Sequence, residues 1–287
     1  MVTIANELLQ ARIHPHGAEL QSLYHKAHDI EYMWSGDPAW WGKYSPVQFP
    51  IVGQLHNNSY TWQGKDYTLP RHGFARENGF IVESADATSA VFALHSSDGI
   101  RAVYPFGFVF RLRYTLTGDT ITVSYEVTNT GNEDMLFSVG GHPAFAVPVV
   151  AGTAYGDYFI EFSQAETAPR WLISNGLIDA PAGLLNDTTQ LPLTHELFYQ
   201  DALVFKNLQS DELSLRSHKT PHGLTMNISE FPYLGIWAAK DAPFACLEPW
   251  QGIADAVQHN GLLEEKEGIL RLPAGETRTY SWQVKCF

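Results

Sequence analysis

The chain has 287 residues, of which 45% are hydrophobic, so it is long enough and apolar enough to bury a full core. Its 31 acidic and 18 basic residues give a formal net charge of −13, and so acidic a chain repels nucleic-acid backbones and anionic membranes. We therefore expect neither a nucleic acid nor a membrane among its partners.

The chain shows no sign of division into parts. No low-complexity linker and no repeat of solenoid or propeller period interrupts it. No run of 18 apolar residues is present, and the first thirty residues lack the pattern of a signal peptide. Two cysteines, Cys246 and Cys286, are too few for a secreted disulfide scaffold. We expect a single domain over residues 1–287, located in the cytoplasm, as a monomer or a homodimer.

Alternation of apolar and polar residues predicts β-strands along most of the chain. Residues 59–69 fit two short strands around a Gln-Gly-Lys turn, and residues 79–97 alternate around a polar turn. The clearest pattern is residues 110–129, where alternating runs on both sides of Gly118-Asp119 predict a hairpin with one buried face. More strands are predicted at 157–163, 213–217 and 279–287. The spacing of these turns is typical of an all-β sandwich or barrel.

Helices are predicted to be few and short. Thr194 is placed to cap a helix of a few turns over residues 194–203. Residues 261–268 can form a single turn. The fold class predicted from these patterns is therefore all-β, with antiparallel strands and little helix.

Three titratable residues lie where a predicted strand meets a bend that contains proline or glycine. His72 lies in such a bend, and His142 precedes Pro143, which a central strand cannot cross unbroken. Glu248 ends the apolar run 244–247, and the Pro-Trp pair after it is expected to close that strand. A histidine in a loop can simply bond a backbone carbonyl. A buried carboxylate is costly unless it is paired or functional, so the three together favour a site.

The other histidines do not indicate a metal site. The pairs His14/His16 and His25/His28 lack the His-Glu-x-x-His spacing of zinc proteases and have no neighbouring cysteine pair. We expect turn or surface histidines there and no metal ion. The chain also lacks phosphate-loop and dinucleotide-binding motifs, so no cofactor is expected.

Tryptophans near the bends favour a sugar ligand. Trp40, Trp41, Trp237 and Trp250 lie in or near these segments. A flat indole can cover the apolar face of a sugar ring while polar neighbours bind its hydroxyls. For any single tryptophan, core packing is the alternative.

Five motifs follow one another over nearly the whole chain: FPIVGQL (49–55), YTLPRHGFAR (67–76), GGHPAF (140–145), QDALVFKNL (200–208) and CLEPWQGIAD (246–255). In this order they resemble the motifs of the aldose 1-epimerases, or galactose mutarotases, and in particular of the LacX-like branch. The resemblance implies a β-supersandwich fold. It also implies interconversion of the α and β anomers of aldoses without a cofactor.

The resemblance implies roles for four residues. Glu248 aligns with the general base, His142 with the proposed general acid, and His72 with a histidine that bonds near the ring oxygen of the sugar. Asp201 matches an aspartate that binds sugar hydroxyls.

The first motif departs from the family pattern. It usually ends in an arginine that helps to bind the substrate, and Gln54 stands there instead. Arg71 and Arg76 are the candidates to compensate for that arginine. Trp237 and Trp250 are the aromatic residues expected to contact the sugar.

Anomer exchange needs a base for the C1 hydroxyl and an acid for the ring oxygen. We expect burial to raise the pKa of Glu248, and a nearby carboxylate to keep His142 protonated. The substrate is then a free or phosphorylated aldohexose. Two alternatives stay open: a non-catalytic carbohydrate-binding or sugar-sensing protein on the same fold, and a glycoside hydrolase or lyase that uses Glu248 and Asp201.

Overall fold

The central hairpin of the protein is the one that the alternation predicts. In the computed structural model, which describes residues 1–287, β10 (Phe108–Thr117) and β11 (Thr120–Asn129) pair antiparallel without a break in register. Every second residue of each strand is buried, so one face of the hairpin points into the core. The predicted hairpin is confirmed, and its turn lies at Gly118-Asp119.

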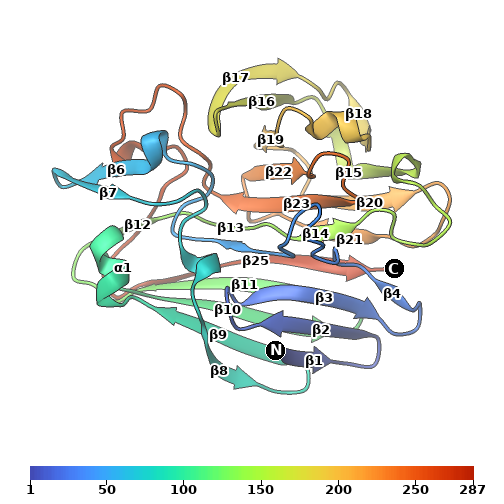
Figure 1. Ribbon diagram of the computed structural model, residues 1–287, viewed down its shortest axis with the longest axis horizontal. Coiled ribbons are helices and arrows are strands. Elements are labelled where there is room, and N and C mark those ends of the chain that lie inside the picture. Colours follow the sequence, from blue (N-terminus) through green and yellow to red (C-terminus); the bar gives the residue numbers. More distant parts are fainter.

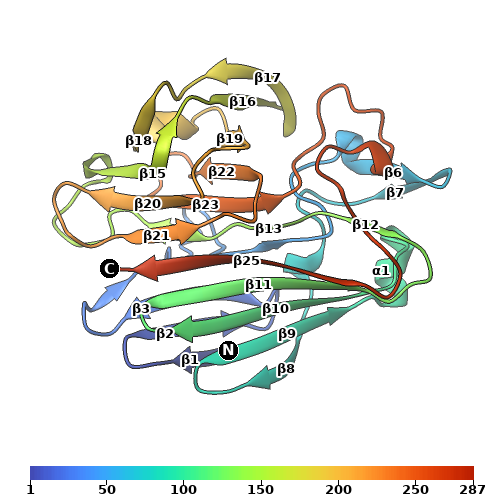
Figure 2. The ribbon, with the colours of Figure 1, turned by 180° about the vertical axis from the view of Figure 1, so that it is seen from behind.

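This hairpin belongs to a nine-stranded antiparallel sheet (Figures 1 and 2). The strands follow in the order β18 (Thr188–Pro192), β15 (Tyr158–Glu166), β20 (Glu212–Ser217), β21 (Leu224–Asn227), β25 (Thr277–Cys286), β11, β10, β9 (Ser89–His95) and β8 (Ile81–Ala85). The strands predicted within 79–97, at 157–163, 213–217 and 279–287 are all present in it. They are therefore confirmed, with small shifts at their ends.

A second, eight-stranded sheet holds the middle and later parts of the chain, with β23 near its centre (Figure 1). Its order is β17 (Leu177–Gly183), β16 (Pro169–Ser174), β19 (Leu203–Lys206), β22 (Tyr233–Trp237), β23 (Phe244–Gln251), β13 (Val139–Gly141) and β5 (Val47–Gln48), and β14 (Ala144–Ala146) also pairs with β23.

Smaller sheets and short helices complete the fold. A four-stranded sheet contains β1 (Val2–Ala5), β2 (Leu9–His14), β3 (Glu19–His25) and β4 (Ile30–Glu31). Two-stranded sheets pair β6 (Ser59–Trp62) with β7 (Lys65–Thr68) and β12 (Met135–Phe137) with β24 (Leu270–Leu272). The helical segments are α1 (Asp98–Val103) and the 3-10 turns η1 (His56–Asn58), η2 (Ala75–Glu77), η3 (Tyr155–Asp157), η4 (His195–Phe198) and η5 (Leu263–Glu265).

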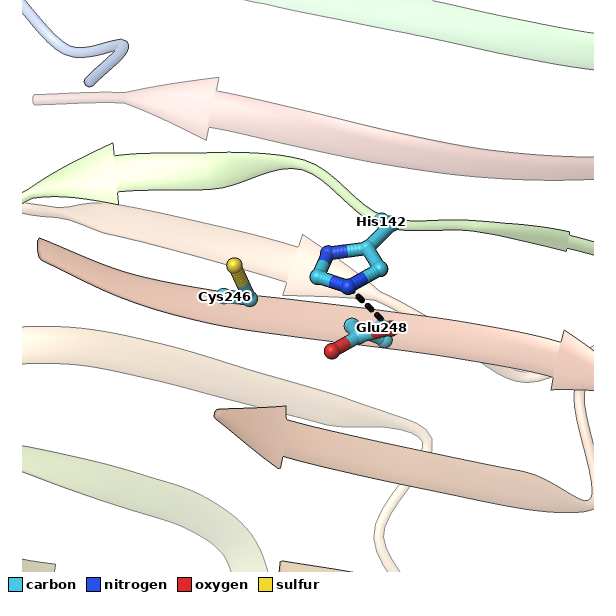
Figure 3. A group of neighbouring side chains, drawn as sticks. All are labelled: His142, Cys246 and Glu248. Atoms are coloured by element: carbon cyan, nitrogen blue, oxygen red, sulfur yellow. Dashed lines mark ion pairs between the residues drawn. The ribbon is translucent and has the colours of Figure 1, made fainter. Parts of the chain in front are cut away.

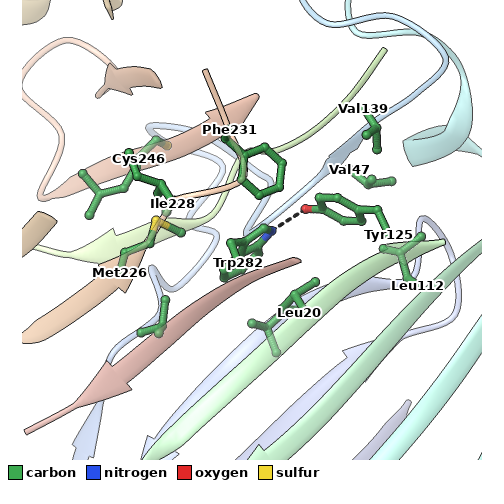
Figure 4. Packing of buried hydrophobic residues seen from close by; sticks show 14 of the residues in the cluster. Leu20, Val47, Leu112, Tyr125, Val139, Met226, Ile228, Phe231, Cys246 and Trp282 are labelled. Carbon is green, nitrogen blue, oxygen red and sulfur yellow. Dashed lines mark hydrogen bonds between the residues drawn. The ribbon is translucent and has the colours of Figure 1, made fainter. Parts of the chain in front are cut away.

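One cluster of 72 buried hydrophobic residues joins these sheets. Figure 4 shows part of it, where Trp282 of β25 donates a hydrogen bond of 2.7 Å from Nε1 to the hydroxyl of Tyr125 of β11. A Cβ at Gly141 would lie 2.6 Å from that hydroxyl. Only a glycine therefore lets β13 rest on this pair, and the residue after Gly141 is His142.

Two expectations about secondary structure are wrong. The helix predicted over 194–203 is only the turn η4, because Thr194 makes no capping hydrogen bond and the turn is closed by Tyr199, after which the chain bends instead of continuing as a helix. The strand predicted to end at Glu248 runs on through Pro249 to Gln251.

Pro249 is tolerated because of where its nitrogen faces. The N–H of Leu247 donates to the carbonyl of Pro143. The nitrogen of Pro249, two residues later in the strand, therefore faces the same neighbouring segment. The residue opposite Pro249 is Gly141, and the pairing of β13 with β23 includes only Val139 and Gly140. Pro143 itself breaks the neighbouring strand into β13 and β14, as predicted. No helix of the structure has the length and apolar character needed to cross a membrane.

Candidate active site

A cavity of about 580 Å³ opens beside the central strands of the eight-stranded sheet. This volume falls in the range of small-molecule sites. The cavity brings together eight of the nine residues proposed from the sequence: His72, His142, Glu248, Asp201, Arg71, Arg76, Trp237 and Trp250. They come from five separate segments of the chain, so the fold and not the sequence places them side by side.

Sheet register sets His142 against Glu248. Gly140 pairs with Trp250 in β13, and Ala144 pairs with Cys246 in β14. The register is the same on both sides of the break, which puts His142 directly opposite Glu248. Their side chains leave the sheet on one face, and Nε2 of His142 lies 3.4 Å from Oε2 of Glu248 (Figure 3).

Glu248 is almost completely buried and has one hydrogen-bond donor among the side chains. Nε2 of Gln48, in β5, donates to its Oε2 over 3.1 Å. Burial raises the pKa of Glu248 to about 8, and the positive charge of Arg71 and the Gln48 hydrogen bond only partly oppose this. The carboxyl group therefore holds its proton at neutral pH, and the direction of the shift agrees with the expectation.

His142 shifts in the direction opposite to the one expected. Burial lowers the pKa of His142 well below its usual range, and the nearby charges of Arg76 and Arg71 lower it further. The expected stabilisation by a carboxylate fails because that carboxyl group, Glu248, is itself protonated. At neutral pH the two side chains in contact thus share a single proton.

The hydrogen bonding of His72 fixes its tautomer. Nδ1 of His72 accepts the backbone N–H of Gly53 over 3.1 Å, so in the neutral ring the proton is on Nε2. Burial lowers the pKa of His72 well below its usual range, and the neighbouring His142, Arg76 and Arg71 add to this. His72 is therefore a neutral hydrogen-bond donor, with its ring centroid 5.8 Å from that of His142.

Charged groups surround the histidines. Nη2 of Arg71 lies 3.8 Å from Oδ1 of Asp201, and Nη2 of Arg76 donates to the carbonyl of Arg71 over 2.9 Å. Asp201 accepts the N–H of Ala202 through the same Oδ1. This leaves carboxylate and guanidinium groups at the cavity, which together can bind vicinal hydroxyls.

Aromatic rings form the apolar part of the site. The ring of Trp41 stacks at 5.0 Å from that of His142, and Trp237 meets His142 edge-on at 5.6 Å. Trp250 is buried and lies against Gly235, where a Cβ would come within 2.4 Å of its ring. Nε1 of Trp250 has no partner within hydrogen-bonding distance, but its approach to Glu248 opposes the rise in the pKa of that carboxyl group.

Gln54 is the exception among the nine residues. It does not line the cavity, and its side chain lies beneath Gly176, where a Cβ would come within 2.2 Å of Oε1. Gly176, with a φ of +82°, lines the cavity in its place. The side chain of Gln54 thus lies behind Gly176 in the wall of the cavity.

The sequence reasoning missed two polar residues at the site. Lys43 lines the cavity, and Gln48 donates a hydrogen bond to the carboxyl group of Glu248. Gln48 stands directly before the motif of residues 49–55. A polar residue next to this apolar motif was the only sign in the sequence that Gln48 belongs to the site. Lys43 lies next to the Trp41-Gly42 bend, and no local pattern in the sequence connects it to the site.

Cys246 completes a group of three side chains that could offer ligands to a metal ion (Figure 3). Its sulfur and one ligand atom each of His142 and Glu248 lie within 4.8 Å of one another. Burial raises the pKa of the Cys246 thiol well above its usual range, as it does that of the carboxyl group. A metal ion would have to displace both protons, so these residues fit a metal site poorly.

Comparisons with known proteins agree with this geometry. The family model of aldose 1-epimerase matches residues 1–273. Protein LacX of Lactococcus lactis subsp. lactis, in its chromosomal form, is 32% identical over 294 residues, which cover 99% of this chain and 98% of that protein.

Two solved structures share the whole fold. A galactose mutarotase related enzyme from Lactobacillus acidophilus is 34% identical with a TM-score of 0.95, over 100% of this chain and 97% of the other. A galactose mutarotase-like protein from Lactobacillus casei ATCC 334 is 32% identical with a TM-score of 0.91, over 100% of both chains. The predicted family resemblance and the predicted all-β fold are confirmed.

Proposed function

Because the chain belongs to the aldose 1-epimerase family, we propose that it interconverts the α and β anomers of an aldohexose, free or phosphorylated, without a cofactor. The observation that carries this proposal is the contact of 3.4 Å between His142 and Glu248 at the wall of a sugar-sized cavity. Two groups that share one proton are what the opening of a hemiacetal requires.

The reaction begins with a proton transfer inside the pair. When the sugar binds, the proton of Glu248 passes to Nε2 of His142, which leaves a carboxylate beside an imidazolium. Glu248 then takes the proton of the C1 hydroxyl while His142 protonates the ring oxygen, and the bond between C1 and the ring oxygen breaks. The product is the open-chain aldehyde.

Closure reverses these steps. After rotation about the C1–C2 bond, the hydroxyl that came from the ring attacks the other face of C1 and returns its proton to His142. Glu248 gives its proton to the former carbonyl oxygen. Because O1 and the ring oxygen are both bonded to C1, adjacent side chains on one face of a sheet reach both atoms without lying on opposite sides of the ring.

His72 assists without changing its charge. Its Nε2–H is directed away from Gly53, whose N–H occupies Nδ1, and it can donate to an oxygen of the sugar. A neutral donor placed by a backbone group does not compete with the proton transfer of the pair. Only His142 and Glu248 therefore change their charge during the proposed reaction.

The test is anomer exchange measured directly. Freshly dissolved α-glucose and α-galactose should reach equilibrium faster with the protein than in buffer alone, as followed by polarimetry or by anomeric proton signals. If no aldose tested equilibrates faster than in buffer while binding persists, the protein is a carbohydrate-binding protein instead. Release of reducing sugar from nitrophenyl glycosides would instead indicate a hydrolase.

A further inference from the structure

The imidazolium that the proposed reaction forms on His142 needs a stabilising neighbour, because the ring is buried. Nδ1 of His142 has no hydrogen-bond partner, so no acceptor at that end of the ring takes up the charge. The positive charges of Arg71 and Arg76 act against it and lower the pKa of His142. Glu248, whose carboxyl group lies 3.4 Å from Nε2, loses its negative charge as soon as it takes the proton of the C1 hydroxyl.

Aromatic rings pack against the imidazole of His142. The indole of Trp41 stacks on it, with the ring centroids 5.0 Å apart and an angle of 26° between the planes. Trp237 lies nearly perpendicular to the imidazole, with the centroids 5.6 Å apart. A stacked indole presents the electron-rich face of its π system, which attracts a cation more strongly than a neutral ring. The interaction of Trp41 with His142 therefore strengthens when the proton arrives.

Contacts within the protein fix the loop that carries Trp41. Its carbonyl accepts the Nε1–H of the buried Trp34 over 2.9 Å, and its N–H donates to the carbonyl of Asp37 over 2.9 Å. The indole also stacks on Phe244 of β23, with the centroids 5.7 Å apart. Backbone and ring are thus both held, so that the indole needs no rearrangement when the charge forms on His142.

We propose that Trp41 is a positioning residue for anomer exchange, which stabilises the protonated ring of His142 through a cation–π interaction and keeps Nε2 directed at Glu248. This inference rests on the proposed function and adds a residue to its machinery. Trp41 also lines the cavity, so the alternative role is contact with the sugar. A residue that stacks on the sugar changes KM, whereas a residue that acts only after the proton has moved changes kcat.

The experiment weakens the π face at position 41 and leaves the size of the side chain almost unchanged. Tryptophans with one, two or three fluorine atoms on the six-membered ring are incorporated there by nonsense suppression, and anomer exchange is measured with glucose and galactose. Each fluorine withdraws electron density and weakens the attraction for a cation. We expect kcat to fall stepwise, by about tenfold over the series, as a cation–π interaction in a desolvated site contributes. KM should change by less than about twofold.

Trp40 provides the matched control. It is the neighbouring residue in the same loop, it is 43% exposed, and it does not line the cavity. The same fluorinated tryptophans at position 40 should leave both kcat and KM unchanged. Conventional variants extend the comparison at position 41: Trp41→Phe, which keeps a smaller π face, should retain more of kcat than Trp41→Leu, which keeps none.

The outcomes separate this inference from the proposed function. A kcat that does not depend on fluorination at position 41 overturns the role of Trp41, because packing alone would then account for the contact. A change in KM without a change in kcat would show that the indole binds the sugar, which also overturns it. In both cases the unsubstituted protein still exchanges anomers and the proposed function stands. If the unsubstituted protein exchanges the anomers of no aldose, the proposed function is contradicted, and the role of Trp41 with it.

Discussion

Glu248 and His142 respond in opposite directions to the same burial. Removal from water disfavours the charged form of each, so the carboxyl group keeps its proton and the imidazole stays neutral. Their contact then lets one proton move between them with little change in the charge of the site. The proposed reaction, in which acid and base exchange roles, benefits from this arrangement.

Substitution of either member of the pair should stop the reaction and leave the fold intact. We expect Glu248→Gln and His142→Asn each to lower kcat by at least about 10²-fold, because each removes a proton-transfer group. The measurement is anomer exchange at saturating sugar, with circular dichroism to confirm folding. Turnover within about threefold of the unchanged protein would remove that residue from the mechanism.

The shared proton predicts the shape of the pH profile. The pair loses its proton as the pH rises through about 8, the pKa of Glu248, and no acid then remains for the ring oxygen. Because the pKa of His142 is lowered, a second proton binds only at strongly acidic pH. We expect kcat/KM to be flat between about pH 5 and 7 and to fall above about 8. An acidic limb with a midpoint near 6.5 would contradict the neutral state of His142.

At the scale of elements, the strands around β23 leave room for its large side chains. Gly235 of β22 pairs with Glu248 in register and makes space for the ring of Trp250. Gly140 of β13 does so from the other side, where a Cβ would lie 2.7 Å from the same ring. Two glycines on neighbouring strands thus make room for one tryptophan near the carboxyl group of Glu248.

Gly235→Ala tests this arrangement. The added methyl group would overlap the Trp250 ring, so we expect the free energy of unfolding to fall by about 1–3 kcal/mol, and kcat/KM to fall with it. Gly183→Ala in β17 is the control, since a Cβ there meets nothing within 4 Å; its effect should stay within about 0.5 kcal/mol. Equal effects of the two changes on urea unfolding would contradict the proposed role of Gly235.

Local patterns predicted the regular elements and missed those that depend on a neighbour. The alternation of residues 110–129 was sufficient for β10 and β11, because each side chain there simply alternates between core and surface. The strand through Pro249 could not be predicted, since it depends on a break in β13 that lies far away in sequence. The helix expected after Thr194 failed for a similar reason, because residues after Phe198 form the cavity wall.

At the scale of the whole molecule, a buried ion pair between Lys266 and Asp255 stabilises the segment that follows β23. Nζ of Lys266 donates to Oδ1 of Asp255 over 2.7 Å and to the carbonyl of Ile253 over 2.6 Å, and both charged side chains are almost inaccessible to solvent. Asp255 also accepts the N–H of His56 through Oδ2. The chain that carries Ala254 to the cavity is thereby joined to the segment that follows Gly53.

Removal of this cation should destabilise the whole fold. Lys266→Met takes the lysine partner away from the buried Asp255, which keeps only the N–H of His56 and the ring of His259 as neighbours, and we expect a loss of about 3–5 kcal/mol in the free energy of unfolding. Lys285→Met, which breaks the exposed pair with Asp119, should cost no more than about 1 kcal/mol. Urea denaturation of both variants gives the comparison, and a loss below about 1 kcal/mol for Lys266→Met would show that the buried pair contributes little.

The site as a whole was predicted better than its chemistry. Short motifs identified eight of the residues at the cavity, because the fold brings the segments that carry these motifs together. The protonation of His142 was predicted wrongly, since the sequence does not show that Glu248 loses contact with water. Gln54 does not line the cavity, because Gly176, from a distant segment, lies in front of its side chain.

The pairing that positions Glu248 has a consequence for how activity returns after denaturation. Gln48 and Glu248 are 200 positions apart along the chain, and His142 reaches Glu248 from the break between β13 and β14. Contacts of such long range form slowly, because a large loop has to close before they contribute. A fragment that ends before β23 lacks Glu248, so we expect it to have none of the proposed activity.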